Sequence, residues 1–314
     1  MKKWLTYSKR RGWLGLLVMG LILAKPQQVH AQQDIMISQY LFNGLLLNPA
    51  YAGSHSYINS TLLQRSQWTQ MDGAPVTSVM AIDGPMAAED LGLGLLITMD
   101  EIGVTSQLDV AVNFAYRLDM PVGHLAFGLR AGAASYRAAL QDVDVWDPTD
   151  PVYNGNEIRE MIPKFGFGVY YSNEIFYLGG SVPVLYALDD VLQNGNDDYF
   201  KRHVMITSGM VFFPSENVSL KPSCLVKYVA TAPVEVDLNL HALFYDRFWL
   251  GLGYRSGASM VAMLEYQISP ALRTGYAHDF TTNGLRTLTG GSHEIMIGFD
   301  LGAGDVKTRS PRYF

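Results

Sequence analysis

The chain has seven histidines, but none of them has the spacing of a metal site. They are His30, His55, His124, His203, His241, His278 and His293. Zinc sites usually draw two ligands from positions a few residues apart, and no second His or Cys lies three to five residues from any of these. The single cysteine, Cys224, excludes an internal disulfide framework. The sequence therefore predicts no metal.

His278 and Asp279 are the one neighbouring pair that suggests a hydrolase. Neighbouring residues of a strand point to opposite faces, so this base and carboxylate would not meet. No Gly-x-Ser-x-Gly nucleophile motif is present. The glycines of 251–257 are superficially similar to a nucleotide loop, but their setting favours a strand followed by a turn. We predict that the chain is not an enzyme and has neither a catalytic residue nor a cofactor.

Two acidic stretches are candidate sites for calcium or a partner. Residues 141–161 hold Asp142, Asp144, Asp147, Asp150, Glu157 and Glu160 against Arg159. Oxygen ligands suit calcium, but the glycine and the closing acid of a hand-type loop do not fall in place. We interpret this stretch as a solvated loop. Whether it or the stretch 183–201 binds calcium or a partner is left open.

The amino-terminal residues have the pattern of an export signal. Five basic residues within positions 2–11 precede an apolar run from Trp13 to Ala24, and Val29-His30-Ala31 ends the pattern. The apolar run is shorter than a membrane-spanning helix requires. We predict a signal peptide over residues 1–31, cleaved near Ala31 and Gln32.

The charge of the mature chain disfavours nucleic acid as a partner. Residues 1–31 hold six of the 23 Lys and Arg and none of the 29 Asp and Glu, which leaves 17 against 29, a net charge of −12. Phosphate binding needs clustered basic residues. No small-molecule substrate is evident either.

Alternation with a period of two dominates the rest of the chain. In 107–117, the apolar residues Leu108, Val110, Val112, Phe114 and Tyr116 alternate with smaller or polar ones. The same pattern recurs at 125–133, 234–244, 248–254 and 294–301. A period of two indicates strands with one apolar face. Membrane barrels are built from such short segments.

Runs between turn signals predict about 14 strands. The long connections, 140–162, 183–201 and 281–290, would then all lie at one end, and short turns at the other. This asymmetry is typical of outer-membrane barrels, whose long loops face outward. Aromatic residues near the expected strand ends would form two interfacial girdles. We predict an all-β fold, a transmembrane antiparallel β-barrel over residues 56–314 in the outer membrane, in contact with its lipid.

A short segment precedes the first expected strand. Residues 38–54 read Ser-Gln-Tyr-Leu-Phe-Asn-Gly-Leu-Leu-Leu-Asn-Pro-Ala-Tyr-Ala-Gly-Ser. Asn43-Gly44 and Asn48-Pro49 interrupt the apolar run, which argues against one continuous helix. We predict that residues 32–55 form a periplasmic or lumenal segment that plugs the barrel or docks a partner.

These residues carry a family resemblance. The opening Gln39-Tyr40, Phe42-Asn43 and Asn48 to Gly53 resembles the signature of the PorP/SprF family of Bacteroidetes. Arg65, Gln67-Trp68 and 73–77 resemble its first hairpin, and the ending 292–314 resembles its last strand and tail. One departure is Gly44, where the family pattern suggests proline.

The resemblance implies a non-enzymatic outer-membrane component of the type IX secretion and gliding machinery. Its partners would be secretion-system proteins of the periplasmic ring and motor, or a secreted adhesin. The candidate partner-binding residues are Gln39, Tyr40, Phe42, Asn43, Asn48, Pro49, Tyr51 and Gly53. The candidate barrel-assembly signal comprises Phe299, Tyr313 and Phe314. Two alternatives stay open: a passive channel with the segment as its plug, and a soluble secreted β-sandwich that binds a ligand.

Overall fold

The computed structural model describes residues 36–86, 90–140, 157–187, 202–230 and 232–302. Nearly all of them belong to one compact unit, residues 33–230 and 234–314. The second unit, residues 1–32 and 231–233, contributes only Ala232 and Pro233 to the described part. The predicted signal peptide lies outside the described residues and stays a prediction. Within the described ranges, no helix is both long and apolar enough to cross a bilayer.

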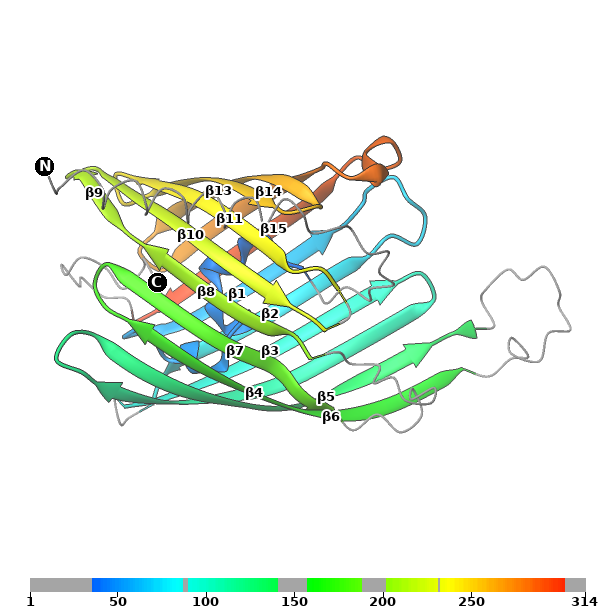
Figure 1. Ribbon diagram of the computed structural model, residues 1–314, viewed down its shortest axis with the longest axis horizontal. Helices are drawn as coiled ribbons and strands as arrows, with labels where there is room; N and C mark the ends of the chain where they lie inside the picture. The colour runs from blue at the N-terminus through cyan, green and yellow to red at the C-terminus, as the bar shows by residue number, and fades with distance from the viewer. Residues whose placement is uncertain (1–35, 87–89, 141–156, 188–201, 231, 303–314) are drawn as a thin grey trace, which may run out of the picture. The chain divides into compact units, whose positions relative to one another are not determined.

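The larger unit is one antiparallel sheet that closes on itself (Figure 1). Its strands are β1 (Ile58–Ser66), β2 (Val76–Pro85), β3 (Leu91–Ile102), β4 (Thr105–Asp119), β5 (His124–Ala138), β6 (Ile158–Ser172), β7 (Phe176–Ala187), β8 (Val204–Met210), β9 (Phe212–Ser215), β10 (Val218–Tyr228), β11 (Glu235–Phe244), β12 (Phe248–Arg255), β13 (Ser259–Ser269), β14 (Leu272–Thr281) and β15 (Ser292–Leu301). The sheet follows chain order, and β15 pairs with β1.

The barrel has 14 strand positions, as the sequence predicted. The two elements β8 and β9 share one position, because both pair with β10 and only Val211 separates them. A single closed sheet is incompatible with two stacked sheets, so the soluble β-sandwich alternative is wrong. Closure leaves no strand edge unpaired, which is what a bilayer demands of a spanning sheet.

The outer face of the wall is apolar and the inner face is polar, which is the opposite of the arrangement in a soluble protein. On β5, the side chain of Leu129 is 61% exposed on the outer face, whereas its neighbour Arg130 is 9% exposed inside. The same alternation puts large apolar residues on the outside of other strands. They include Phe114, Phe165, Leu240, Leu252, Met260 and Ile295. Charged residues such as Glu294 lie buried inside. An apolar exterior around a polar interior defines a barrel that spans a membrane.

The connections between strands differ between the two ends of the barrel. One end carries residues 67–75, 139–157, 188–203 and 282–291, and we call it the long-loop end. The other end carries 120–123, 173–175, 216–217, 245–247 and 270–271, and we call it the short-turn end. Two of the expected loops are shorter than predicted, because β6 begins at Ile158 and β7 continues to Ala187. Long loops face the cell exterior in barrels of this kind.

Exposed aromatic side chains lie near both ends of the outer surface. They are Tyr116, Phe212 and Phe248 near the short-turn end, and Tyr228, Tyr254 and Phe280 near the long-loop end. Trp68 lies beyond the strand ends, in the connection 67–75. Aromatic rings favour the boundary between lipid and water, so these two sets mark the borders of the apolar band.

Candidate functional site inside the barrel

The residues that precede β1 lie inside the barrel. Residues 36–57, which we call the lumenal segment, contain three short 3-10 turns: η1 (Gln39–Phe42), η2 (Gly44–Leu46) and η3 (Pro49–Tyr51). In Figure 1 they form the dark blue turns enclosed by the strands. A fourth turn, η5 (Gly284–Thr287), lies far from them in the connection 282–291. The segment is the candidate functional site, because it fills a space that other barrels use as a channel.

Local sequence explains why the segment turns instead of forming one helix. The side chain of Asn48 accepts a hydrogen bond from the N–H of Ala50 at 2.9 Å, which caps η3. Pro49 occupies the first position of that turn, where its missing N–H costs nothing. Gly53 has a φ of +65°, a conformation that glycine adopts without strain, and there the chain turns toward β1.

At the long-loop end, a buried cluster of charges holds the start of the segment. The carboxylate of Glu294 accepts the N–H of Ser38 at 2.6 Å and that of Gln39 at 3.0 Å. The hydroxyl of Ser38 donates to the carboxylate of Asp279 at 2.8 Å. Arg65 bonds to both carboxylates, at 2.9 Å from Asp279. Because all three charged side chains are at most 4% exposed, the cluster is fixed in a dry site.

The middle of the segment binds the opposite wall through its backbone. The hydroxyl of Ser181 on β7 donates to the carbonyl oxygen of Leu47 at 2.6 Å. Arg130 on β5 donates to the carbonyl oxygen of Leu45 and to the side chain of Asn113. The amide of Asn48 donates to the carbonyl oxygen of Val169 on β6 at 2.9 Å. The bonds to Leu47 and Leu45 pair carbonyls that short 3-10 turns leave without intrahelical partners.

At the short-turn end, Gly53 binds a carboxylate and a guanidinium. Its N–H donates to Asp83 on β2 at 2.9 Å, and its carbonyl oxygen accepts from Arg117 on β4. Beside it, the ring of His55 packs edge-on against Tyr51 at 5.5 Å between ring centroids. Burial, reinforced by the charge of Arg273, lowers the pKa of His55 to about 3, so this imidazole is neutral at pH 7.

Close packing of the segment depends on missing side chains in the wall. A Cβ added to Gly128 on β5 would lie 2.0 Å from the backbone nitrogen of Ala50. A Cβ on Gly92 of β3 would lie 2.0 Å from the carbonyl oxygen of Ala52. Neither distance is possible for a real carbon, so the backbone of the segment sits directly on the backbone of two strands.

Aromatic residues of η1 fill the remaining side of the lumen. The hydroxyl of Tyr40 accepts a hydrogen bond from the amide of Asn239 at 2.7 Å. Phe42 contacts Trp249 edge-on at 6.2 Å and His241 at 5.7 Å between ring centroids. Burial raises the pKa of Tyr40 well above its usual range, which keeps the hydroxyl neutral. The segment therefore contacts β11 and β12 as well as β1 to β7.

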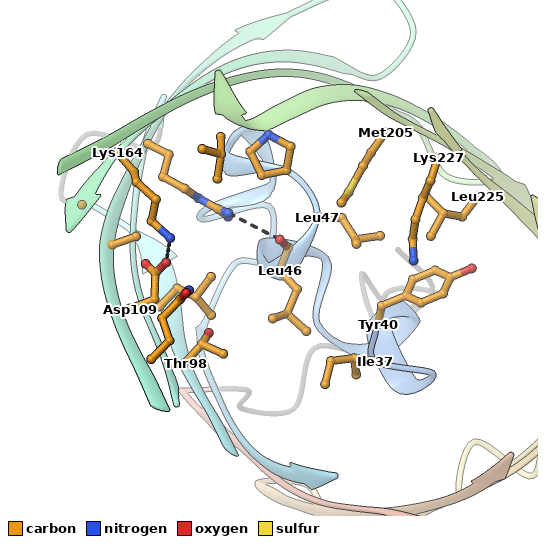
Figure 2. Close-up of a pocket in the computed structure, with 17 residues that line it drawn as sticks. Ile37, Tyr40, Leu46, Leu47, Thr98, Asp109, Lys164, Met205, Leu225 and Lys227 are labelled. Carbon is orange, nitrogen blue, oxygen red and sulfur yellow. Dashed lines mark hydrogen bonds and ion pairs between the residues drawn. The ribbon is translucent and has the colours of Figure 1, made fainter. Parts of the chain in front are cut away.

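A cavity of about 110 Å³ remains between the segment and the long-loop end (Figure 2). Apolar side chains of the segment, including those of Ile37, Leu46 and Leu47, form part of its lining. The rest is wall, where Lys164 of β6 forms an ion pair with Asp109 of β4. The room suits a few water molecules rather than a wide path.

The predicted partner-binding residues are brought together, but inside the barrel. Of these, Gln39, Tyr40, Asn43, Asn48, Pro49, Tyr51 and Gly53 are buried, and Phe42 is half-buried. Their contacts in this structure are with the barrel itself. Phe299 lies on the outer face of β15 and is 39% exposed, and Tyr313 and Phe314 lie outside the described residues. Both roles stay predictions.

The charged residues of the wall that hold the segment were not predicted as part of the candidate site. Arg65 and Glu294 lie in stretches that carry the family resemblance, whereas the only signal for Asp83, Arg117 and Asp279 was their place on the polar face of their strands. The carboxyl of Asp279 points inward, while His278 on the outer side lies beside His293 at 4.5 Å between ring centroids. Among the described residues, no group of three His, Cys, Asp or Glu could hold a metal ion. Most of the acidic stretch 141–161 lies outside that part.

The fold and the lumenal segment identify the general class of this protein. A closed 14-strand barrel with an apolar exterior is an outer-membrane protein, and here its lumen is occupied by its own amino-terminal segment. The model of the PorP/SprF family, described as type IX secretion system membrane proteins, matches residues 29–299. The chain belongs to this family.

Solved structures with a similar fold are outer-membrane barrels. The outer membrane protein Omp33 of Acinetobacter baumannii has 9% identity and a TM-score of 0.47, covering 79% of this chain and 100% of that one. The CymD monoaromatic hydrocarbon channel has 13% identity and a TM-score of 0.47, covering 82% and 91%. Outer membrane phospholipase A of Escherichia coli has 9% identity and a TM-score of 0.40, covering 85% and 98%. Likenesses this low carry no argument about function. No curated protein sequence matches the chain.

Proposed function

We propose that this barrel is a non-enzymatic component of a type IX secretion system that acts by binding proteins, not by conducting solutes. Its partner is a large exported surface protein, which it anchors or helps to export, or the periplasmic ring and motor complex. The observation that carries the proposal is the occupied lumen. Membership in the PorP/SprF family supplies the secretion context.

The contacts of the lumenal segment favour a segment that stays bound in the lumen over one that leaves it to open a channel. It bonds to side chains of eight strands, β1, β2, β4, β5, β7, β11, β14 and β15, and to the backbone of β6. A conduit would need this set of bonds exchanged for bonds to water, and each exchange costs a net of about 0.5–1.5 kcal/mol. A barrel filled in this way is suited to serve as a rigid anchor in the membrane.

A passive channel with the segment as plug is the second candidate. It is favoured by the form of the segment, which is three separate 3-10 turns joined to the wall by side chains and by no strand pairing. Such a piece leaves the lumen without breaking the sheet. The wall behind it is polar, as the lining of a water-filled pore is.

One experiment separates the two candidates. An affinity tag inserted in the connection 282–291 avoids the carboxyl terminus, where Phe314 is a predicted assembly signal, and allows detergent purification from native outer membranes. Co-purification of a surface protein or of ring subunits, absent from an untagged strain, together with a silent protein in planar bilayers, supports the secretion role. A barrel that purifies alone and conducts in the bilayer overturns it in favour of the channel.

A further inference from the structure

The lumenal segment has a direction, which the positions of its anchors along the strands reveal. Ser38 bonds to Asp279, near the end of β14, and to Glu294, near the start of β15. Both strand positions adjoin the connection 282–291 at the long-loop end. The early part of the segment therefore lies at that end of the lumen.

The late part of the segment lies at the opposite end. Gly53 bonds to Asp83, near the end of β2, and to Arg117, near the end of β4. Both positions adjoin short turns, and β1 begins there at Ile58. From Ser38 to Gly53 the chain thus crosses the lumen from the long-loop end to the short-turn end. It then reverses and returns as β1.

The lining of the cavity in Figure 2 gives an independent check of this direction. Ile37 shares that cavity with Thr98 of β3, Gln107 of β4 and Lys227 of β10. Thr98 lies late in a strand that runs toward the long-loop end, and Gln107 lies early in the strand that leaves it. Lys227 is next to the last residue of β10, which also ends there. Ile37 therefore lies in the long-loop half of the lumen.

From these positions we infer that the mature protein presents its amino terminus at the long-loop end, the face that a partner on the cell surface reaches. Five residues separate the predicted terminus at Gln32 from Ile37, and a fully extended chain of that length spans at most about 18 Å. The apolar band of such a barrel is about 25 Å tall. A chain of that length, starting from Ile37 in the long-loop half, is shorter than the apolar band is tall.

This topology adds an interaction surface to the proposed function without depending on it. In a barrel whose first strand starts at the periplasmic end, a free amino terminus would by default hang in the periplasm. Here the described start of the segment, Ile37 and Ser38, lies at the long-loop end instead, so the chain enters the lumen from that end. A protein partner on the cell surface would meet the amino terminus and the long connections together, whereas a periplasmic partner would meet the short turns.

The test places one short epitope at three positions in the full-length chain, expressed with its own leader. The first position directly follows Gln32, the second is in the connection 282–291, and the third is in the short turn 216–217. Antibody binding is measured on intact cells and again after the outer membrane is permeabilised. Gel mobility before and after heating verifies that each barrel is folded.

We expect the epitope after Gln32 to be labelled on intact cells together with the one in 282–291. The epitope in 216–217 should be labelled only after permeabilisation. If the epitope after Gln32 instead follows the one in 216–217, the inference is overturned. The comparison between epitopes tests the direction of the segment whichever end faces outward, and it reads out nothing about secretion. Its failure is therefore distinct from failure of the proposed function.

Discussion

The guanidinium of Arg65 on β1 lies 2.9 Å from the carboxylate of Asp279 on β14, and it also bonds to Glu294 on the strand between them. Glu294 in turn accepts the N–H groups of Ser38 and Gln39. One buried cluster thus belongs both to the closing seam of the barrel and to the anchor of the lumenal segment. Wall stability and lumen occupancy are linked through it.

Replacing Arg65 with methionine should destabilise the barrel strongly. The change leaves two buried carboxylates without their shared cation, and breaking a buried ion pair costs about 3–5 kcal/mol. Arg255 stays 3.5 Å from Asp279, so Glu294 suffers the larger loss. Urea titration of the protein folded in lipid vesicles measures the free energy of unfolding. A variant as stable as the parent would contradict the role of the cluster.

Arg159 provides the matched control for that variant. It also pairs with a carboxylate, that of Glu157 at 2.7 Å, but its side chain is 70% exposed. Exposed pairs contribute little because water already solvates both charges. Arg159→Met should therefore leave the urea midpoint unchanged, which would show that burial and not loss of an arginine explains the effect at Arg65.

An arginine on the outer face should reveal the depth of the apolar band. Leu129 is 61% exposed near the middle of β5, and an arginine there should cost about 2–4 kcal/mol in a bilayer. Val122, which is 66% exposed in the turn 120–123, is the control, and Val122→Arg should cost at most about 1 kcal/mol. Folding titrations in vesicles compare the two. Equal costs would mean that Leu129 does not face lipid.

The wall of this barrel could be predicted from sequence because apolar and polar residues alternate along each strand and so distinguish its outer face from its inner face. Alternation at 107–117 and at its repeats gave the strand number, the closure and the short-turn end. The ends of β6 and β7 were less clear, because Arg159 and Glu160 interrupt the apolar pattern near the start of β6 and Pro183 interrupts it within β7. Strand pairing with β5 extends β6 back to Ile158 all the same.

The seat of the lumenal segment could not be predicted in the same way. Its residues were singled out through the family resemblance, but their contacts join positions far apart in the chain, such as Gly53 with Asp83, 30 residues apart, and Ser38 with Glu294, 256 residues apart. Such pairs exist only once the register between β14, β15 and β1 is fixed. The sequence also does not show why residue 128 must be glycine, since a glycine within a strand has several possible causes.

Adding a side chain to Gly128 should unseat the segment. A Cβ there would lie 2.4 Å from the Cα of Ala50, so Gly128→Val forces the backbone of η3 away from β5. The lumen behind it is polar and should then carry ions. We expect the parent protein to be nearly silent in planar bilayers and the variant to show a steady conductance. A folded variant that stays silent would show that the segment tolerates displacement without opening a path.

Gly180 is the control for this conductance measurement. It lies in β7 of the same sheet, and no atom lies within 4 Å of the Cβ that a substitution would add. Gly180→Val adds the same volume at an exposed position, so the new side chain does not contact the segment, and the carbonyl oxygen of Gly180 still accepts the amide of Asn48 at 3.5 Å. It should remain as silent as the parent, and heat-dependent gel mobility should show both variants folded.

Acid should loosen the segment through His55. The pKa of this buried imidazole is about 3 in the seated state, against an ordinary value of about 6.5, because burial disfavours the charged form. When the segment has left its place in the lumen, His55 binds a proton at a higher pH than when it is buried. The contribution of His55 to holding the segment in place is therefore fully present only above pH 6.5. That contribution is lost as the pH falls from 6.5 toward 3. As the pH falls from 7.5 to 4.5, the conductance of the parent should increase relative to that of His55→Gln. Carboxylates that titrate in this window affect both proteins alike, so a constant difference between the two curves would exclude His55 as the group responsible.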